Sequence, residues 1–89
     1  MQIKYEKSFL HDLQNITDVK IKKRIESVIT EIKKSITITT IKNIKKLVGY
    51  KYYYRIRIGN YRMGIKIDDD NVVTLIRIKH RKDIYKSFP

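Results

Sequence analysis

Residues 50–67 read YKYYYRIRIGNYRMGIKI, and apolar and polar side chains alternate along most of this stretch. A period of two is typical of a half-buried β-strand, so we expect one strand before Gly59-Asn60 and another after it. Glycine tolerates positive φ, so Gly59-Asn60 predicts a two-residue hairpin turn. On the first strand, one face carries Tyr50, Tyr52, Tyr54, Ile56 and Ile58, and the other carries Lys51, Tyr53, Arg55 and Arg57.

A further strand is expected at Val72–Lys79, after the hairpin and a turn at 68–71. This strand is apolar on both faces near its start, which is typical of a central strand. If Ile58 pairs with Tyr61 in the first hairpin, Arg57 lies opposite Arg62. If the second turn closes symmetrically on Asp69-Asp70, Arg62 also lies opposite Arg77, and three arginines form one row across the sheet.

Such a row is unfavourable for stability alone, because like charges opposite one another destabilise a sheet by up to about 1 kcal/mol per pair. A bound polyphosphate would favour it, since each arginine can make a charge-assisted, often bidentate contact. Gly64 is expected to leave the backbone beside Arg55 open to a ligand. Tyr53 and Tyr85 add aromatic rings, as on surfaces that bind single-stranded RNA. The alternative is that the arginines only line the solvent-exposed face of the sheet.

The elements outside this hairpin are read from shorter patterns. Residues 1–6 alternate and predict a first strand. Ser8 is expected to cap a short helix that ends near Asn15, and Thr17 to cap a second helix with Asp18 in its first turn. The second helix has one apolar face, formed by Ile21, Ile25, Val28, Ile29 and Ile32. The two helices are expected to form a hairpin, Lys42–Val48 a helical turn or loop, and the tail from His80 to Pro89 a short helical turn.

Composition limits the classes of protein. The chain has 89 residues, 21 Lys and Arg against 9 Asp and Glu, and a net charge of +12. This length predicts a single domain over 1–89, and the charge predicts a polyanionic partner. The absence of cysteine excludes disulfides and thiolate metal sites. No stretch is long and apolar enough for a membrane span, so we expect a cytoplasmic protein with no membrane partner.

The residue types in the basic half favour metal-free chemistry over other hydrolytic mechanisms. Its acidic residues lie mainly in the turn at 68–70, so a two-metal nuclease is not expected. RNA carries its own nucleophile, the 2′-hydroxyl, so its cleavage needs only a proton acceptor, cations for the phosphorane charge and a proton donor. Arginine, tyrosine and one histidine can fill these three roles, and we expect no metal and no cofactor.

Three stretches resemble the RelE/ParE superfamily of bacterial toxin–antitoxin toxins, in its RelE-like branch: Ile44–Gly49, Tyr54–Arg62 and Arg77–Tyr85. The resemblance covers essentially the whole chain. It implies an α+β fold, a small twisted antiparallel sheet of about four strands with an N-terminal helical hairpin packed on it. The element order read from the residues agrees with this expectation.

The resemblance also implies an activity. RelE-like toxins cleave mRNA in the ribosomal A site without metal and leave a 2′,3′-cyclic phosphate, whereas ParE-like toxins poison DNA gyrase. The residues that carry the RelE reaction fall on Arg55, Arg57, Arg62, Arg81 and Tyr85 by position. We expect Arg57 and Arg62 to bind the scissile phosphate and Arg81 to stabilise the transition state and leaving group.

The proton acceptor is left open between His80 and Tyr85. Arginine stands at 55 and 57 where lysine is usual in the best-known RelE type, and arginine hardly deprotonates. Histidine titrates near neutrality and can take the role, although His80 could equally pack against the tail. RNA binding is expected from Lys51, Tyr53, Arg55, Lys66, Arg77, Lys79 and Lys82.

The partners implied by the resemblance are a cognate antitoxin, the ribosome and mRNA. An acidic antitoxin segment would complement the basic chain. Two other functions stay open: a gyrase inhibitor with the same fold, and a non-catalytic nucleic-acid-binding module.

Overall fold

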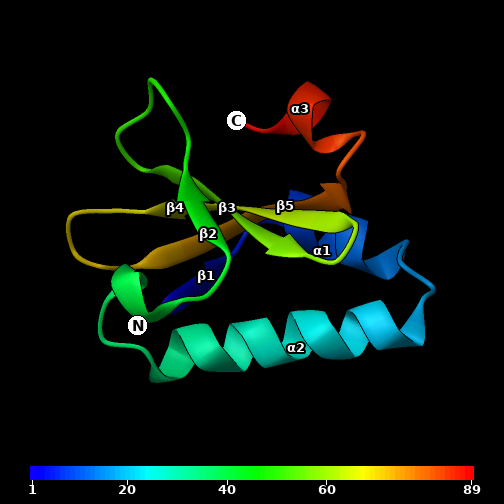
Figure 1. The fold of residues 1–89 in the computed structure, drawn as a ribbon, viewed down its shortest axis with the longest axis horizontal. Coiled ribbons are helices and arrows are strands. Elements are labelled where there is room, and N and C mark those ends of the chain that lie inside the picture. Colours follow the sequence, from blue (N-terminus) through cyan, green and yellow to red (C-terminus); the bar gives the residue numbers. More distant parts are fainter.

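The computed structural model describes residues 1–89 as a five-stranded sheet with helices on both sides (Figure 1). Along the chain the elements are β1 (Ile3–Tyr5), α1 (Lys7–Gln14), α2 (Val19–Lys34), the 3₁₀ turn η1 (Ile38–Thr40), β2 (Ile44–Lys46), β3 (Tyr53–Ile58), β4 (Tyr61–Ile67), β5 (Val73–His80) and α3 (Ile84–Ser87). The strands lie in the order β1-β5-β4-β3-β2. The fold is α+β, as predicted.

The β3–β4 hairpin has the register that the alternation predicts. Ile58 pairs with Tyr61, Arg57 with Arg62, Arg55 with Gly64 and Tyr53 with Lys66. Gly59 has a φ of +58°. Glycine is the residue favoured at the first central position of a type II′ turn, whose twist matches that of the flanking strands. This turn therefore brings Arg55, Arg57 and Arg62 onto one face of two adjacent strands.

The predicted register between β4 and β5 is wrong, because the structure shifts β5 by two residues. Arg62 lies opposite Lys79, and Arg77 lies opposite Gly64. One residue of the shift comes from the turn, where Asn71 adopts a φ of +64° and lengthens the loop. The other comes from a bulge in β5, between Leu75 and Arg77, opposite Gly64/Ile65. The row across the sheet is therefore Arg57, Arg62 and Lys79.

Both edges of the sheet differ from the expected antiparallel arrangement of about four strands. β1 pairs parallel to β5, with Ile3 opposite Val73 and Tyr5 opposite Leu75. At the other edge, Ile44–Lys46 forms the short strand β2 beside β3. The expectation of a helical turn or loop at Lys42–Val48 is thus wrong for the residues of β2.

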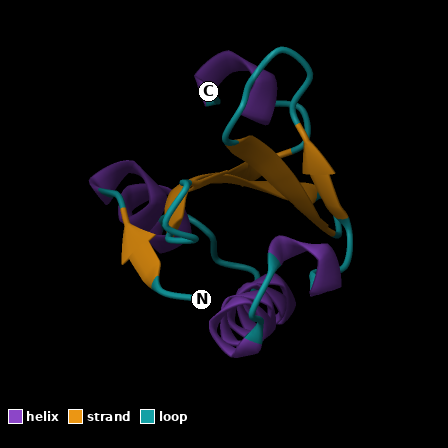
Figure 2. Ribbon diagram, turned by 90° about the vertical axis from the view of Figure 1, so that its left-hand side faces the viewer, coloured by secondary structure: helices purple, strands orange, loops and turns teal.

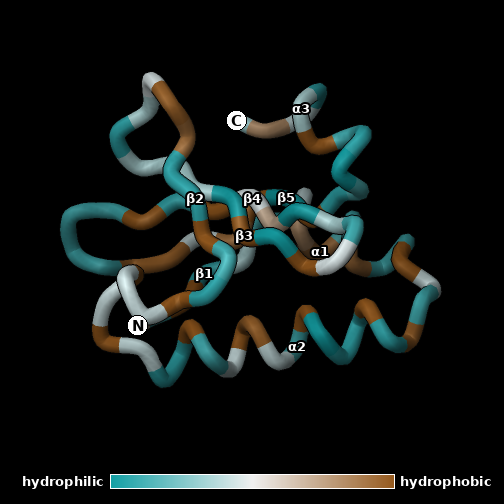
Figure 3. Tube along the Cα trace, viewed as in Figure 1, coloured by the Kyte–Doolittle hydropathy of each residue, from teal (hydrophilic) through white to brown (hydrophobic).

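The main core lies between the sheet and α2. Figure 2 shows α2 on one side of the sheet and α3 on the other. Figure 3 shows hydrophobic residues recurring along the edge of α2 that is turned toward the sheet. Asp18, not Thr17, caps this helix: its Oδ1 accepts hydrogen bonds from the main-chain N–H groups of Lys20 and Ile21. The fully buried side chains include Phe9, Ile25, Ile32, Ile56, Ile58, Met63, Ile65, Leu75 and Ile78.

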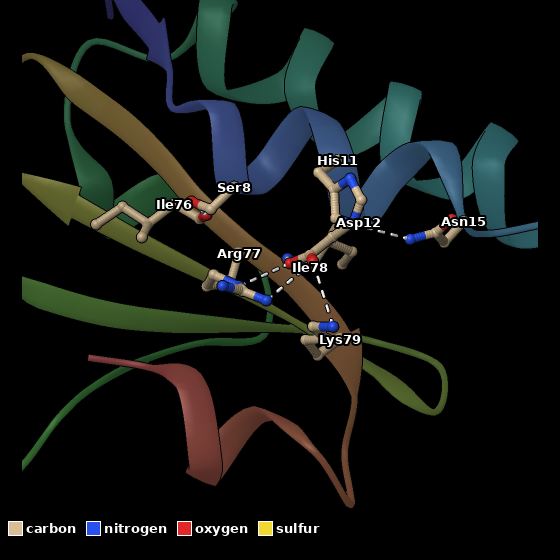
Figure 4. Close-up of polar contacts among 8 residues, drawn as sticks. All are labelled: Ser8, His11, Asp12, Asn15, Ile76, Arg77, Ile78 and Lys79. Carbon is tan, nitrogen blue, oxygen red and sulfur yellow. Dashed lines mark hydrogen bonds and ion pairs between the residues drawn. The ribbon is translucent and has the colours of Figure 1, made fainter.

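Helix α1 packs along the part of β5 that extends beyond the end of β1 (Figure 4). Glu6 occupies the N-cap position of α1, and the predicted cap Ser8 instead donates from Oγ to the Ile76 carbonyl oxygen at 2.6 Å. One turn later, Asp12 Oδ2 accepts from the Ile78 N–H at 3.1 Å. Each of these two side chains forms a hydrogen bond with a backbone group of β5 that would otherwise bond a neighbouring strand. Hence α1 packs along β5, while α2 covers the face of the sheet.

The C-terminal segment leaves the sheet and folds back over its other face. The predicted helical turn is present as α3, and Leu47, Ile84 and Phe88 form a second buried cluster there. The Phe88 ring lies over Gly64, so the expectation that Gly64 leaves open backbone for a ligand is wrong. No helix has the length and apolar character needed to cross a membrane.

Candidate nucleic-acid interface

A cleft of about 410 Å³ opens on the face of the sheet that carries α3. Its walls come from four parts of the fold: the loop before β2, β2 itself, the β3–β4 hairpin and α3. The lining side chains are those of Asn43, Ile44, Lys45, Arg55, Arg57, Arg62 and Tyr85. Strand pairing and the fold of the tail therefore bring together residues that are up to 42 positions apart in sequence (43 to 85).

Arg55 and Tyr85 form a cation–π pair at one end of the cleft. The Arg55 guanidinium carbon lies 4.7 Å from the centroid of the Tyr85 ring. Tyr85 is 73% exposed, so its ring and hydroxyl are accessible to a ligand. Lys45 lies directly opposite Arg55 on β2 and adds a second cation at this end.

Arg57 and Arg62 are held in the cleft by neutral oxygen atoms. Arg57 Nη2 donates to Asn43 Oδ1 at 3.3 Å. Arg62 Nη1 donates to the carbonyl oxygens of Gly59 and Tyr61, at 2.9 Å each. These acceptors are uncharged, so they do not offset the charge of the two guanidinium groups, and both groups retain other N–H donors for a ligand.

The cleft cations have no internal counter-charge. The ion pairs of the protein both involve Asp12, which lies 2.8 Å from Arg77 Nε and 3.3 Å from Lys79 Nζ. Lys45, Arg55, Arg57 and Arg62 pair with no carboxylate. An anion with several oxygen atoms, such as a phosphodiester, is the ligand that this arrangement suits.

Two residues predicted for catalysis, His80 and Arg81, lie outside the cleft lining. Arg81 is exposed next to the hairpin tip, where its N–H donates to the Asn60 carbonyl oxygen at 2.7 Å. His80 packs edge-on against Tyr61, with ring centroids 5.7 Å apart, in a separate hollow beside Asp12. Its Nδ1 lies 3.2 Å from the main-chain nitrogen of Lys82, whose side chain is exposed. The structure therefore does not bring His80 to the cleft.

The remaining predicted RNA-binding residues have other surroundings. Tyr53 packs edge-on against Phe88, with centroids 5.6 Å apart, and Lys66 lies opposite it on β4. Arg77 and Lys79 are held by Asp12, which is only 3% exposed (Figure 4). Lys51 is exposed near the Tyr52 ring; interaction with the Tyr52 hydroxyl, and then with the Asp69 carboxylate, raises the pKa of Lys51.

The sequence analysis missed Asn43, Lys45 and Asp12. Asn43 and Lys45 lie in a short edge segment whose β-strand could not be distinguished from a loop. Asp12 had a detectable signal, because it stands three residues after Phe9 and next to Leu13, on the apolar side of α1. A carboxylate on a buried stripe indicates a cationic partner elsewhere in the fold. No group of three His, Asp or Glu side chains has a metal-binding arrangement.

Comparison with known proteins agrees with this architecture. Residues 3–85 match the family described as ParE toxin of type II toxin–antitoxin system, parDE. The chain belongs to this family, in the RelE/ParE superfamily. This toxin is also 42% identical over 90 residues to Toxin RelE3 of Methanocaldococcus jannaschii, and the alignment covers 100% of both chains.

Solved structures show the same fold for this toxin. The RelB–RelE antitoxin–toxin complex from Methanococcus jannaschii contains a chain that matches with a TM-score of 0.82 and 41% identity, over 97% of this chain and 99% of that chain. The archaeal RelE–RelB complex from Pyrococcus horikoshii OT3 matches with a TM-score of 0.73 and 22% identity, over 90% and 93% of the two chains. Since this relative is archaeal, the expected restriction of such toxins to bacteria is too narrow.

Proposed function

We propose that this toxin is a metal-independent, ribosome-dependent mRNA endoribonuclease of the RelE-like branch, with residues 1–89 acting as one toxin domain in the cytoplasm. The observation that carries the proposal is the cleft in which Arg55, Arg57 and Arg62 stand beside the Tyr85 phenol without any carboxylate partner. Guanidinium groups left unpaired in a cleft suit a phosphate whose negative charge increases during reaction.

The proposed reaction is an attack of a ribose 2′-hydroxyl on the adjacent phosphorus atom. A bond forms between the 2′-oxygen and phosphorus, the bond from phosphorus to the 5′-oxygen breaks, and the products are a 2′,3′-cyclic phosphate and a 5′-hydroxyl. The proton of the 2′-hydroxyl passes to a base, and the leaving 5′-oxygen receives one from an acid. Arg57 and Arg62 bind the non-bridging oxygens of the phosphate, and Arg55 binds the RNA backbone.

Tyr85 and Lys45 are the side chains of the cleft that can exchange a proton, because arginine hardly deprotonates. We assign the proton transfer at the 2′-hydroxyl to Tyr85, whose ring stacks on the Arg55 guanidinium. His80 does not share this cleft and is not assigned that role. We assign to Arg81 the stabilisation of the negative charge on the leaving 5′-oxygen, because its exposed side chain starts beside the tip of the β3–β4 hairpin.

The proposed partners are an antitoxin and the translating ribosome. Three similar solved structures are RelB–RelE toxin–antitoxin complexes, including the one from Escherichia coli at 20% identity. An acidic antitoxin segment would complement the net charge of +12, and ribosomal RNA would attract the same surface.

The test is induced expression in a bacterial host, followed by primer extension on mRNA from translating ribosomes. We expect a rapid loss of protein synthesis and cuts at fixed positions within codons, with 2′,3′-cyclic phosphate ends. An Arg57→Ala variant serves as the matched control. Intact mRNA at toxic expression levels of the wild-type chain would refute the proposal.

Inhibition of DNA gyrase is the second candidate function, because the matching family is described as ParE toxin. It predicts a different outcome in the same experiment: DNA breaks and filamentous cells, with intact mRNA. Purified gyrase with the wild-type chain then tests it directly. Absence of both effects would favour the non-catalytic nucleic-acid-binding module.

A further inference from the structure

We infer that Gly64 and Phe88 form a notch that positions Tyr85 in the cleft. The notch is the space above the Gly64 Cα, into which the Phe88 ring fits. This inference rests on the proposed ribonuclease function, and it assigns to Gly64 and Phe88 a role that requires no contact with RNA.

The fit between the two residues leaves no room for a side chain at position 64. A Cβ atom built on Gly64 would lie 2.6 Å from Cγ and Cδ1 of Phe88 and 2.8 Å from Cδ2. Real Cβ contacts are not that short, so the ring can lie here only because residue 64 is glycine. Phe88 is 5% exposed and also packs edge-on against Tyr53, with centroids 5.6 Å apart.

Phe88 in the notch and Ile84 together attach α3 to the sheet. The helix Ile84–Ser87 is only four residues long, and its buried apolar contacts come from Ile84 and from Phe88, which follows it. Tyr85 is 73% exposed, and it contacts the sheet through the cation–π pair with Arg55. Since an exposed cation–π pair is worth only about 0.5–1 kcal/mol, it cannot by itself hold a short helix in place.

The notch lies beside the cleft. Gly64 pairs directly with Arg55 across the β3–β4 hairpin, so the Phe88 ring rests next to the residue on which Tyr85 stacks. Displacing Phe88 therefore moves Tyr85 relative to Arg55, Arg57 and Arg62, while the main core on the opposite face keeps its packing. Phe88 and Gly64 are positioning residues, and Tyr85 is the residue that they position.

The experiment compares cleavage on programmed ribosomes with hydrogen exchange of the free toxin, for the wild type, Gly64→Ala, Phe88→Ala and the double variant. We expect Gly64→Ala to lower the single-turnover cleavage rate by about 100-fold, the loss typical of misplacing a reactive group by about 1 Å. The main-chain N–H groups of Lys86 and Phe88, which donate to Asp83 and Ile84, should exchange about tenfold faster or more. Exchange in the core strands should stay as in the wild type.

The double variant distinguishes the notch from a general effect on the strand. In the Phe88→Ala background the added methyl group meets no ring, so Gly64→Ala should cause no further loss of cleavage or protection. Equal losses in both backgrounds would overturn the inference. In a Tyr85→Ala background, Gly64→Ala should likewise cost little, and a full additional loss would show that the notch does not act through Tyr85.

Ser87→Ala is the matched control in α3, because it removes a buried hydroxyl that has no hydrogen-bond partner and leaves the notch intact. It should cleave at the wild-type rate. Unchanged exchange of Lys86 and Phe88 in Gly64→Ala would overturn the anchoring role. Faster exchange with a wild-type chain that cuts no mRNA would instead refute the proposed function while leaving the anchor in place.

Discussion

The almost fully buried carboxylate of Asp12 interacts with three donor groups. Its carboxylate accepts from Arg77 through two guanidinium nitrogens, from the Ile78 N–H, and lies 3.3 Å from Lys79 Nζ (Figure 4). A buried charge is tolerated when it is paired and hydrogen-bonded in this way, but removing one partner exposes the full desolvation cost of the others. Asp12 therefore links the end of α1 to the bulged half of β5.

The first prediction concerns this carboxylate. We expect Asp12→Ala to lower the free energy of unfolding by about 3–5 kcal/mol, as for the removal of one partner from a buried ion pair. Urea denaturation monitored by circular dichroism measures the loss. Asp18→Ala is the matched control, because it removes only an exposed N-cap and should cost about 1 kcal/mol. Equal losses for the two variants would contradict the role of Asp12.

The second prediction compares two arginines that differ in their partners. Arg57→Gln should lower the single-turnover cleavage rate by about 100- to 1000-fold, the range for losing one donor to a transition-state anion. Arg77→Gln should leave the rate within a few-fold of the wild type, because Asp12 already neutralises Arg77. A large loss for Arg77→Gln without a loss of stability would show that Arg77 contacts the RNA.

At the scale of elements, the bulge in β5 determines which side chains reach which face. Val73 and Leu75 face the main core, and uninterrupted alternation would bring Arg77 and Lys79 into it as well. The extra residue reverses the alternation, so Ile78 is buried and His80 lies beside Tyr61 on the core side. The same reversal that keeps two cations out of the core moves His80 away from the cleft.

The sequence predicts those parts of the fold that depend on regular periods. The hairpin register and the apolar face of α2 are of this kind, and the gathering of Arg55, Arg57 and Arg62 follows from the hairpin. The β4–β5 register depends on a left-handed Asn71 and a bulge, which leave no mark in the alternation. Likewise, the hydrogen bond from Ser8 to β5 depends on where β1 ends, which is a property of the assembled sheet.

The third prediction concerns the loop that leads into β2. Asn43 has a φ of +61° and accepts a hydrogen bond from Arg57 through Oδ1. Asn43→Gly keeps this backbone conformation and removes the amide, so it should slow cleavage about tenfold, as expected for one hydrogen bond to a charged group, with stability nearly unchanged. Asn43→Ala should in addition lose about 1–2 kcal/mol of stability, the cost of a left-handed conformation for a residue with a Cβ.

Both losses in Asn43 variants are measured on the same preparations, by single-turnover cleavage and by urea denaturation. Identical stability of Asn43→Gly and Asn43→Ala would contradict the backbone part of this prediction. Wild-type cleavage by Asn43→Gly would contradict the positioning of Arg57 by the amide.

For the molecule as a whole, the net charge of +12 is distributed unevenly. Arg77 and Lys79 have a carboxylate partner, whereas the cations of the cleft have none. Binding of RNA to such a surface releases condensed counterions, and the logarithm of the affinity falls with the logarithm of the salt concentration by about 0.7 per phosphate contacted in a single strand. The slope of this salt dependence therefore measures how many phosphates the cations of the protein contact.

The last prediction follows from that count. With Arg55, Arg57 and Arg62 each contacting one phosphate, the slope for a short single-stranded RNA should be about −2 or steeper. Arg55→Gln and Arg57→Gln should each make it less steep by about 0.7, because each removes one phosphate contact. Arg77→Gln should leave it unchanged, since its charge is already satisfied by Asp12. Equal changes for all three variants, measured by fluorescence anisotropy from low to physiological salt, would mean that RNA responds to the overall charge of the chain and not to the cleft.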